Sequence, residues 1–518
     1  MKIRIGLMAP STAWTQLCEQ EGIPCATVDV SSPATAEEYS ILVVNRALGP
    51  KGREAVEQYL RDGGGVIGYT LYLRHVAGVE GTEQDVRYLV AEGDTIFPSV
   101  HLLDLGVHGW IPHGANALRT DLNTMAVRAG DLGNGFAVVL PFDVDVVFHN
   151  GRAVNKNFYF TLDRLPSERV SMVAKGELHH LVHYAFEYLH HVRGMPYVHL
   201  WYFPNNFRNV FAFRIDSDGS SREEMDALYQ IGHDHNVAMT WFLDVKSHET
   251  WLDHFRYFVD QEIGLHCYEH QTYPTLEWNL KNITRGLHEM QQAGLQPLGF
   301  AAPFGVWNPE LGKAIDEVGF HYSSEFSYAC DTLPLLPESG GTKFKTLQVP
   351  VHPICIGSLM RAGYSDARMR EYFTMVAAQK FSRHEPLFFY HHPSHRHWNV
   401  VEGIFSLAGE GVEIMTLGAY AEWWKRRRAV KYAADIEGEV VRIHVSGSPF
   451  PGDVWLRVTN TRRDEVILPA GESIALTSLR WTAPVVPAPP PADIRRIREF
   501  DPRKMLGELY DSLVRKLR

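Results

Sequence analysis

Cysteine is scarce in this chain, and the few cysteines are scattered. The 518 residues include five, none of them spaced as C-x-x-C: Cys18, Cys25, Cys267, Cys330 and Cys355. This pattern excludes a regular disulfide framework and argues against a zinc site built from cysteines alone. It is typical of free thiols in a reducing compartment.

Long hydrophobic runs and an excess of positive charge are also missing. No window approaches the roughly 20 apolar residues that a membrane-spanning helix needs. The first residues, MKIRIGLMAPSTAW, lack the apolar stretch and the cleavage site of a secretion signal. Asp and Glu (61) outnumber Lys and Arg (50), which gives a formal net charge of -11. These features predict a cytoplasmic protein whose partners do not include nucleic acid.

Residues 1–195 alternate strand-like and helix-like segments, which predicts a doubly wound α/β domain. KIRIGLM, YSILVVN and VIGYT have the composition of strands, and KGREAVEQYLRDGGG is an amphipathic helix closed by glycines. The pattern resembles class I glutamine amidotransferase-like and flavodoxin-like domains. Those amidotransferases carry a nucleophilic cysteine at a strand-to-helix turn, where GYTLYL has Tyr69 and Thr70. The resemblance therefore implies a non-catalytic domain with a structural or docking role.

Three further regions are expected, because a chain of this length divides into about two to four domains. Strands and helices alternate again in residues 196–428, and residues 429–483 have the alternation and turns of a small β-sandwich-like domain. Residues 484–518 combine a proline-rich linker with a basic amphipathic helix. That helix is suited to packing on the protein or a partner, with peripheral membrane contact as the alternative. The histidine-rich GELHHLVHYAFEYLHHVRG, before residue 196, is expected to be a helix with half-exposed histidines.

Two aspartates close the strand-like segment NVFAFRIDSDG. Arg214 and Asp216 fall on the same face of this strand, and Asp218 precedes the break at Gly219. Neighbouring acids near a core carry a desolvation cost that packing does not explain, and the carboxyl ends of parallel strands are where α/β enzymes hold their sites. The alternative is a turn capped by an aspartate side chain.

A second apolar segment ends in histidines. In EIGLHCYEH, His266 and His270 can reach one cation if the intervening residues form a helical turn. With Asp218 they make three protein ligands, the number found in catalytic zinc sites that keep one position open. Zn²⁺ is the preferred ion, and Co²⁺, Mn²⁺ or Ni²⁺ suit the same donors. Two polar residues decorating one turn remain the alternative.

Two more strand-like segments end in similar motifs, GFAAPFG and FFYHHPSHRH. With these four motifs in order, residues 205–428 resemble the polysaccharide deacetylases of carbohydrate esterase family 4. The resemblance implies an irregular (β/α) barrel of about seven strands. It also implies that Asp216 is the catalytic base and that Asp218, His266 and His270 bind the metal. Cys267 stands where serine or threonine is usual.

The later motifs carry further implied roles. Phe304, in APFG, would offer its backbone N–H to the oxyanion, and His392 would be the catalytic acid, with His391 as the alternative. The family's arginine before the third motif is replaced here by Ala301. We expect Arg214 to supply the missing positive charge, unless its guanidinium has a structural partner elsewhere.

Within that family, the segments FRIDSDGSSREE, EIGLHCYEH and YSSEF are similar to those of the deformylase that acts on formamido-arabinose attached to a polyprenyl lipid. The expected activity is therefore metal-dependent hydrolysis of an acetyl or formyl group from an amino sugar, carried by a cytoplasmic nucleotide- or lipid-linked precursor. Glu325 and Asp331 are candidates to orient the catalytic histidine or to bind substrate. Two alternatives stay open: a metal-independent amidase with a non-sugar substrate, and a catalytically silent carbohydrate-binding scaffold.

Overall fold

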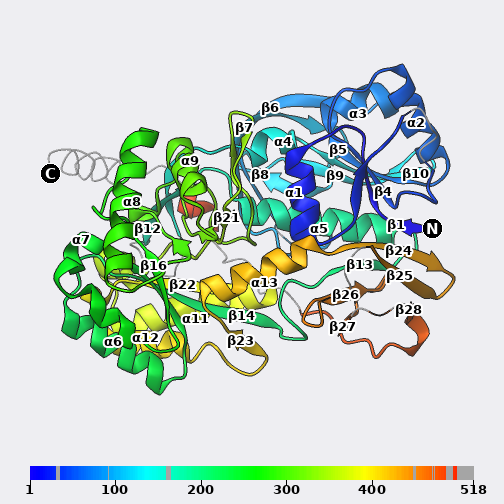
Figure 1. Ribbon diagram of the computed structural model, residues 1–518. Helices are drawn as coiled ribbons and strands as arrows, with labels where there is room; N and C mark the ends of the chain where they lie inside the picture. The colour runs from blue at the N-terminus through cyan, green and yellow to red at the C-terminus, as the bar shows by residue number, and fades with distance from the viewer. Residues whose placement is uncertain are drawn as a thin grey trace.

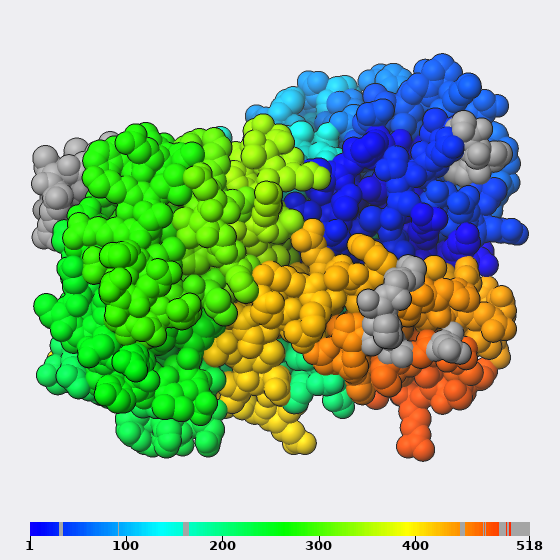
Figure 2. All heavy atoms as spheres, in the orientation of Figure 1, coloured from blue at the N-terminus to red at the C-terminus, as the bar shows by residue number. Residues whose placement is uncertain are grey.

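The computed structural model describes residues 1–30, 35–91, 93–158, 165–446, 451–469, 471, 473–485 and 494–498. An N-terminal α/β region lies at the upper right of Figure 1, a second α/β region at the left, and C-terminal strands at the lower right. Figure 2 shows the three regions packed against one another. One cluster of buried apolar side chains draws members from all three, so the predicted boundaries near residues 195 and 428 fall inside a shared core.

The N-terminal region contains a nine-stranded sheet of order β3-β2-β4-β5-β10-β9-β8-β6-β7. Its first five strands are parallel. Counted along the chain, they have the order 2-1-3-4-5 of doubly wound, flavodoxin-like sheets. The remaining strands are antiparallel. The strands are β2 (Ile5–Leu7), β3 (Cys25–Thr27), β4 (Ile41–Val44), β5 (Gly65–Tyr69), β6 (Gly81–Val90), β7 (Leu103–Pro112), β8 (Ala117–Thr120), β9 (Met125–Leu132) and β10 (Gly135–Leu140).

Helices cover both faces of the parallel strands, as expected for a doubly wound sheet. On β4, Ile41 and Val43 belong to the core shared with α1 (Thr12–Glu21) and α5 (Lys175–His191). Leu42 and Val44 point the other way, into the core under α2 (Pro50–Arg61) and α3 (Thr70–Ala77). A strand buried on both faces needs the unbroken apolar run that the sequence shows.

The turn after β5 has a structural explanation. The Thr70 hydroxyl is buried and lies 2.7 Å from the carbonyl oxygen of Trp110 and 2.9 Å from that of Leu140. It therefore ties the start of α3 to β7 and β10.

The histidines of α5 differ from the expectation of half-exposed positions. His179, His180, His183 and His190 are all buried, with relative exposures of 6% or less. The reason is that α5 packs between the N-terminal sheet and β13 (Tyr197–Leu200), where buried acids face it. His183, for example, lies 2.7 Å from the carboxylate of Glu21.

The second α/β region is built on eight parallel strands in an open, half-barrel arrangement of order β21-β18-β17-β16-β15-β14-β22, with β23 beside β14. On the central strand, Phe211, Phe213 and Ile215 pack against the helices, so Arg214 and Asp216 face the opposite side. The strands are β14 (Asn209–Asp216), β15 (Met239–Leu243), β16 (Glu262–Leu265), β17 (Gly299–Phe300), β18 (Tyr322–Ser323), β21 (Leu347–Gln348), β22 (Leu387–His391) and β23 (Val412–Ile414).

Helices follow these strands in alternation, which gives the region its α/β character. They are α6 (Arg222–Asp234), α7 (Val245–His248), α8 (Leu276–Gln292), α9 (Pro309–Val318), α10 (Ile356–Arg361), α11 (Asp366–Ser382), α12 (Trp398–Phe405) and α13 (Leu417–Ala429).

The C-terminal strands pair with distant parts of the chain, which differs from the self-contained β domain expected for residues 429–483. β24 (Lys431–Glu437) pairs with β1 (Lys2–Ile3), and β25 (Val440–Ser446) lies between β24 and β28 (Ser473–Ala475). β26 (Trp455–Thr459) pairs with β13 and with β27 (Glu465–Pro469). Their apolar faces complete the core under α1, α5 and α13.

Most of the predicted basic helix and of the proline-rich linker lies outside the described residues. The described part of the basic segment, η5 (Ile494–Arg498), is a short 3-10 helix in which Arg498 pairs with Asp104. Within the ranges given above, no helix is both long enough and apolar enough to cross a membrane.

Candidate active site

The candidate site lies where neighbouring parallel strands end. Ile215 pairs with His391 across β14 and β22, and Asp216 pairs with Phe242 across β14 and β15. Because parallel strands share one direction, their carboxyl ends and the loops that follow meet at the same edge of the sheet.

Asp218 is the centre of this group. It follows β14 in a left-handed backbone conformation (φ 28°), and the next helix, α6, begins with Ser221 in a capping box with Glu224. The Asp218 Oδ1 atom lies 3.3 Å from His266 Nε2 and 3.1 Å from His270 Nε2.

These three residues fit a divalent cation of the zinc type. Their donor atoms lie within 4.8 Å of one another. Asp218 Oδ1 and His270 Nε2 are buried and have no hydrogen-bond partner in the described part of the chain, an unusual state for buried polar atoms. His266 Nδ1 donates a 2.7 Å hydrogen bond to the Ala301 carbonyl, which leaves Nε2 as the nitrogen with a free lone pair. One carboxylate and two imidazoles leave a coordination position for water or substrate.

Asp216 is held by Arg214 from the same strand. The guanidinium Nε lies 2.6 Å from Oδ1 and one terminal nitrogen 2.7 Å from Oδ2, a two-point contact. Arg214 is fully buried, donates also to the Ser324 carbonyl, and lies between the rings of Phe242 and Tyr390. The positive charge therefore sits beside the predicted base, with a structural contact to Ser324 as well.

The two histidines after β22 have different surroundings. His392 Nε2 lies 3.1 Å from Asp218 Oδ2. Burial opposes its protonation, but the Asp218 carboxylate outweighs this effect and holds the pKa of His392 above its ordinary value. His391 is fully buried against Phe213 and Trp398, and burial lowers its pKa well below the usual range. The geometry therefore places His392 at the site and His391 in the core.

Phe304 lies at the rim of the site. Its backbone is left-handed (φ 58°), its side chain is 57% exposed, and its ring meets that of His270 edge to face at 4.8 Å. Proteins use such strained turns to aim backbone groups at a ligand.

Neither of the acids predicted to bind substrate lies at the rim of the site as Phe304 does. Glu325 is fully buried and accepts hydrogen bonds from Ser323 and Gln348, so it supports the strand ends from inside. Asp331 is bound by His352 and Lys380, at 3.0 and 2.7 Å, and lines two other cavities of about 140 and 160 Å³.

Three further residues lie at the site and were not predicted. Asp244 directly follows β15 and is buried, which raises its pKa. An acid at a strand end is the signal that identified Asp216 and Asp218, and it could have identified Asp244. Cys355 and His395 lie next to His392. VHPICIG around Cys355 carries no recognisable motif, and His395 is one of several histidines in HHPSHRH.

No family model and no curated protein matches the chain. Solved structures do: a candidate polysaccharide deacetylase from Mycobacterium smegmatis is 18% identical, with a TM-score of 0.38, over 43% of this chain and 93% of the other. An allantoinase is 16% identical (TM-score 0.35, 43% and 92% covered). A family 4 carbohydrate esterase from Streptomyces lividans, solved with acetate, is 15% identical (TM-score 0.29, 40% and 91% covered).

Proposed function

We propose that this protein removes an acetyl or formyl group from the nitrogen of an amino sugar, in a hydrolysis that depends on a divalent metal. The observation that carries the proposal is the arrangement around Asp218. Its carboxylate faces His266 and His270, while Asp216, clamped by Arg214, and His392 flank it. A cation-binding group, a base and an acid are the three parts that amide hydrolysis by activated water requires.

Asp218, His266 and His270 would hold the cation, with Zn²⁺ the best match to their donors. When bound, the ion acts as a Lewis acid on the amide oxygen and makes a nearby water more acidic. Asp216 takes the proton from that water. Arg214 pairs with Asp216 and fixes its orientation through two hydrogen bonds.

His392 delivers a proton to the departing nitrogen, because an amine anion is a very poor leaving group. His392 Nε2 lies 3.1 Å from Asp218 Oδ2, so the proton is delivered beside the cation-binding group. The Phe304 N–H would stabilise the negative charge on the oxygen. The exposed Phe304 ring offers an apolar face to the substrate at the rim.

The substrate class that we propose is a cytoplasmic amino sugar linked to a nucleotide or a polyprenyl lipid, with the formylated form as one candidate. The test uses purified protein, stripped with a chelator and reloaded with Zn²⁺, Co²⁺, Mn²⁺ or Ni²⁺. N-acetyl and N-formyl amino sugars in nucleotide- and lipid-linked forms are offered, and acyl loss is followed by mass spectrometry. Asp216→Asn serves as the matched inactive variant.

Each outcome distinguishes the alternatives. Metal-dependent release that Asp216→Asn abolishes supports the proposal. Release that survives chelation points to a metal-independent amidase, and no release under any metal condition points to a non-catalytic scaffold.

A further inference from the structure

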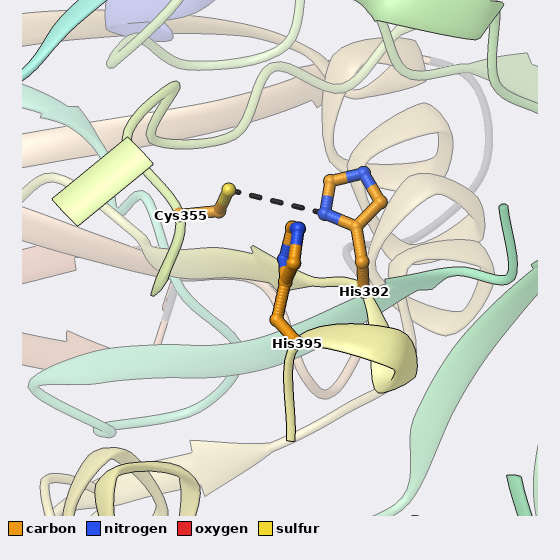
Figure 3. Close-up of side chains that lie close together, drawn as sticks. All are labelled: Cys355, His392 and His395. Atoms are coloured by element: carbon orange, nitrogen blue, oxygen red, sulfur yellow. Dashed lines mark hydrogen bonds between the residues drawn. The ribbon is translucent and has the colours of Figure 1, made fainter. Parts of the chain in front are cut away.

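A second group of metal-binding side chains lies behind the candidate acid. Cys355 precedes α10, and His392 and His395 follow β22. Figure 3 shows the three side chains converging, with the Cys355 sulfur 3.9 Å from His392 Nδ1. One donor atom from each residue lies within 4.8 Å of the other two.

The local structure makes room for this group. His395 packs over Gly357, where an added Cβ would come within 2.1 Å of the imidazole ring. Glycine therefore lets the ring lie close to the start of α10, next to the thiol. His395 Nδ1 is buried without a hydrogen-bond partner among the described residues. A buried imidazole nitrogen without a partner is free to bind a metal ion.

Cys355 brings a sulfur atom to the same place. Its side chain is buried, with a relative exposure of 1%, and the sulfur faces His392 Nδ1. A thiolate with two imidazoles is a soft donor set that selects Zn²⁺ over Mg²⁺ or Ca²⁺.

A third cluster of possible metal ligands, formed by Glu21, His183 and His199, does not have the character of a metal site. His199 Nδ1 lies 3.1 and 2.9 Å from the carbonyl oxygens of Glu21 and Leu200, to which it donates. The Arg457 guanidinium is 3.5 Å from the other nitrogen of His199, where it would repel a cation. That cluster is a satisfied hydrogen-bond network.

We infer that Cys355, His392 and His395 form a second Zn²⁺ site, and that filling it inhibits the enzyme. His392 is shared, since Nε2 faces Asp218 and Nδ1 faces Cys355. An ion on Nδ1 occupies the nitrogen that carries the second hydrogen of the acid form, so His392 cannot take that form while the ion is bound. The inhibitory role rests on the proposed function, in which His392 is the acid, whereas the metal site itself does not.

Binding is tested by titrating metal-free protein with Co²⁺. A thiolate ligand gives an intense ultraviolet charge-transfer band, which the Asp218–His266–His270 site, having no sulfur, cannot give. We expect this band to appear after the first equivalent, and to be lost in Cys355→Ser and His395→Gln. His397→Gln is the matched control, because His397 is on the same loop but pairs with Asp366. The visible Co²⁺ bands of the first site report whether each variant is folded.

Inhibition is tested by measuring hydrolysis with increasing Zn²⁺ after the first site is filled. We expect wild type and His397→Gln to lose about 100-fold in rate at saturation, the scale of a lost general acid, and to recover on mild chelation. Each variant is compared with its own rate at low Zn²⁺, and Cys355→Ser and His395→Gln should show no such decline.

The outcomes separate the two proposals. The second metal site is overturned if wild type lacks the thiolate-to-Co²⁺ charge-transfer band (the sulfur band), or if this band persists in Cys355→Ser. Hydrolysis that excess Zn²⁺ leaves unchanged overturns the inhibitory role. A sulfur band in a protein that hydrolyses none of the amino sugars overturns the proposed function and leaves the second metal site standing.

Discussion

Arg214 and Asp216 are two residues apart on one strand and face each other through two hydrogen bonds of 2.6 and 2.7 Å. The pair is almost completely buried, with relative exposures of 0% and 3%. Burying a charged group is costly unless it is paired and hydrogen-bonded, and the guanidinium gives the Asp216 carboxylate both a charge partner and two donors. The strand itself thus supplies a positive charge beside the proposed base.

Replacing Arg214 by Met should lower turnover while leaving bound metal unchanged. Without the guanidinium the Asp216 carboxylate loses the two hydrogen bonds that orient it, so it should be less able to take the proton from the attacking water. We expect a loss of about 10²–10³-fold in kcat near neutral pH, the range attributed to a misplaced general base.

Arg214→Lys is the matched variant and should recover part of the rate, since it keeps the charge but not the two-point contact. Because removing one partner of a buried ion pair costs about 3–5 kcal/mol, the folded fraction is measured alongside. A kcat near that of wild type in folded Arg214→Met would contradict the positioning role.

Replacing Asp218 by Asn should release the metal. The change removes the only charge among the three ligands, so the loss of affinity should exceed the 10–100-fold that altered supporting contacts typically cause. Metal content after dialysis, measured by mass spectrometry, and activity should fall together. His233→Gln, on the exposed part of α6, is the control and should retain both. Full metal occupancy in Asp218→Asn would mean that the cation is bound elsewhere.

His392 and His391 should respond differently to substitution. His392→Gln should lower kcat by about 10²–10⁴-fold with little change in metal content. His391→Leu should leave kcat near wild type and alter stability little. Its two ring nitrogens are buried without partners among the described residues, so an apolar side chain of similar size removes an unmet polar cost. Steady-state kinetics and thermal unfolding of both variants check this. The reverse pattern would make His391 the acid.

The parts of the site that follow strand geometry could be predicted from the sequence. Alternation along NVFAFRID places Arg214 and Asp216 on one face, and the common direction of parallel strands brings Asp218, His266 and His392 to one edge. Local patterns contain this information because the strands are short and each ends at or near a candidate site residue. The same signal was available for Asp244.

Contacts between distant segments could not be predicted. β24 pairs with β1 across more than four hundred residues, and no local pattern specifies such a partner. The α5 histidines have a polar composition that suggests exposure, but they are buried because Glu21 and Glu385 lie opposite them. Cys355 meets His392 only through the placement of α10.

A prediction about stability concerns Lys175, at the start of α5. Its ammonium is buried, donates to the carbonyls of Asn150 and Tyr328 at 2.9 and 2.7 Å, and burial lowers its pKa to about 7. The unfolded chain, with an ordinary lysine pKa near 10.4, binds the proton more readily between these two values, so stability should rise as pH increases from about 7 to about 10. Over that interval the contribution amounts to a few kcal/mol at most.

Replacing Lys175 by Met should flatten this rise in stability with pH. The effect is isolated by the difference in unfolding free energy between wild type and Lys175→Met, measured by urea denaturation at several pH values. Parallel curves for the two proteins would show that the Lys175 ammonium keeps its ordinary proton affinity in the fold.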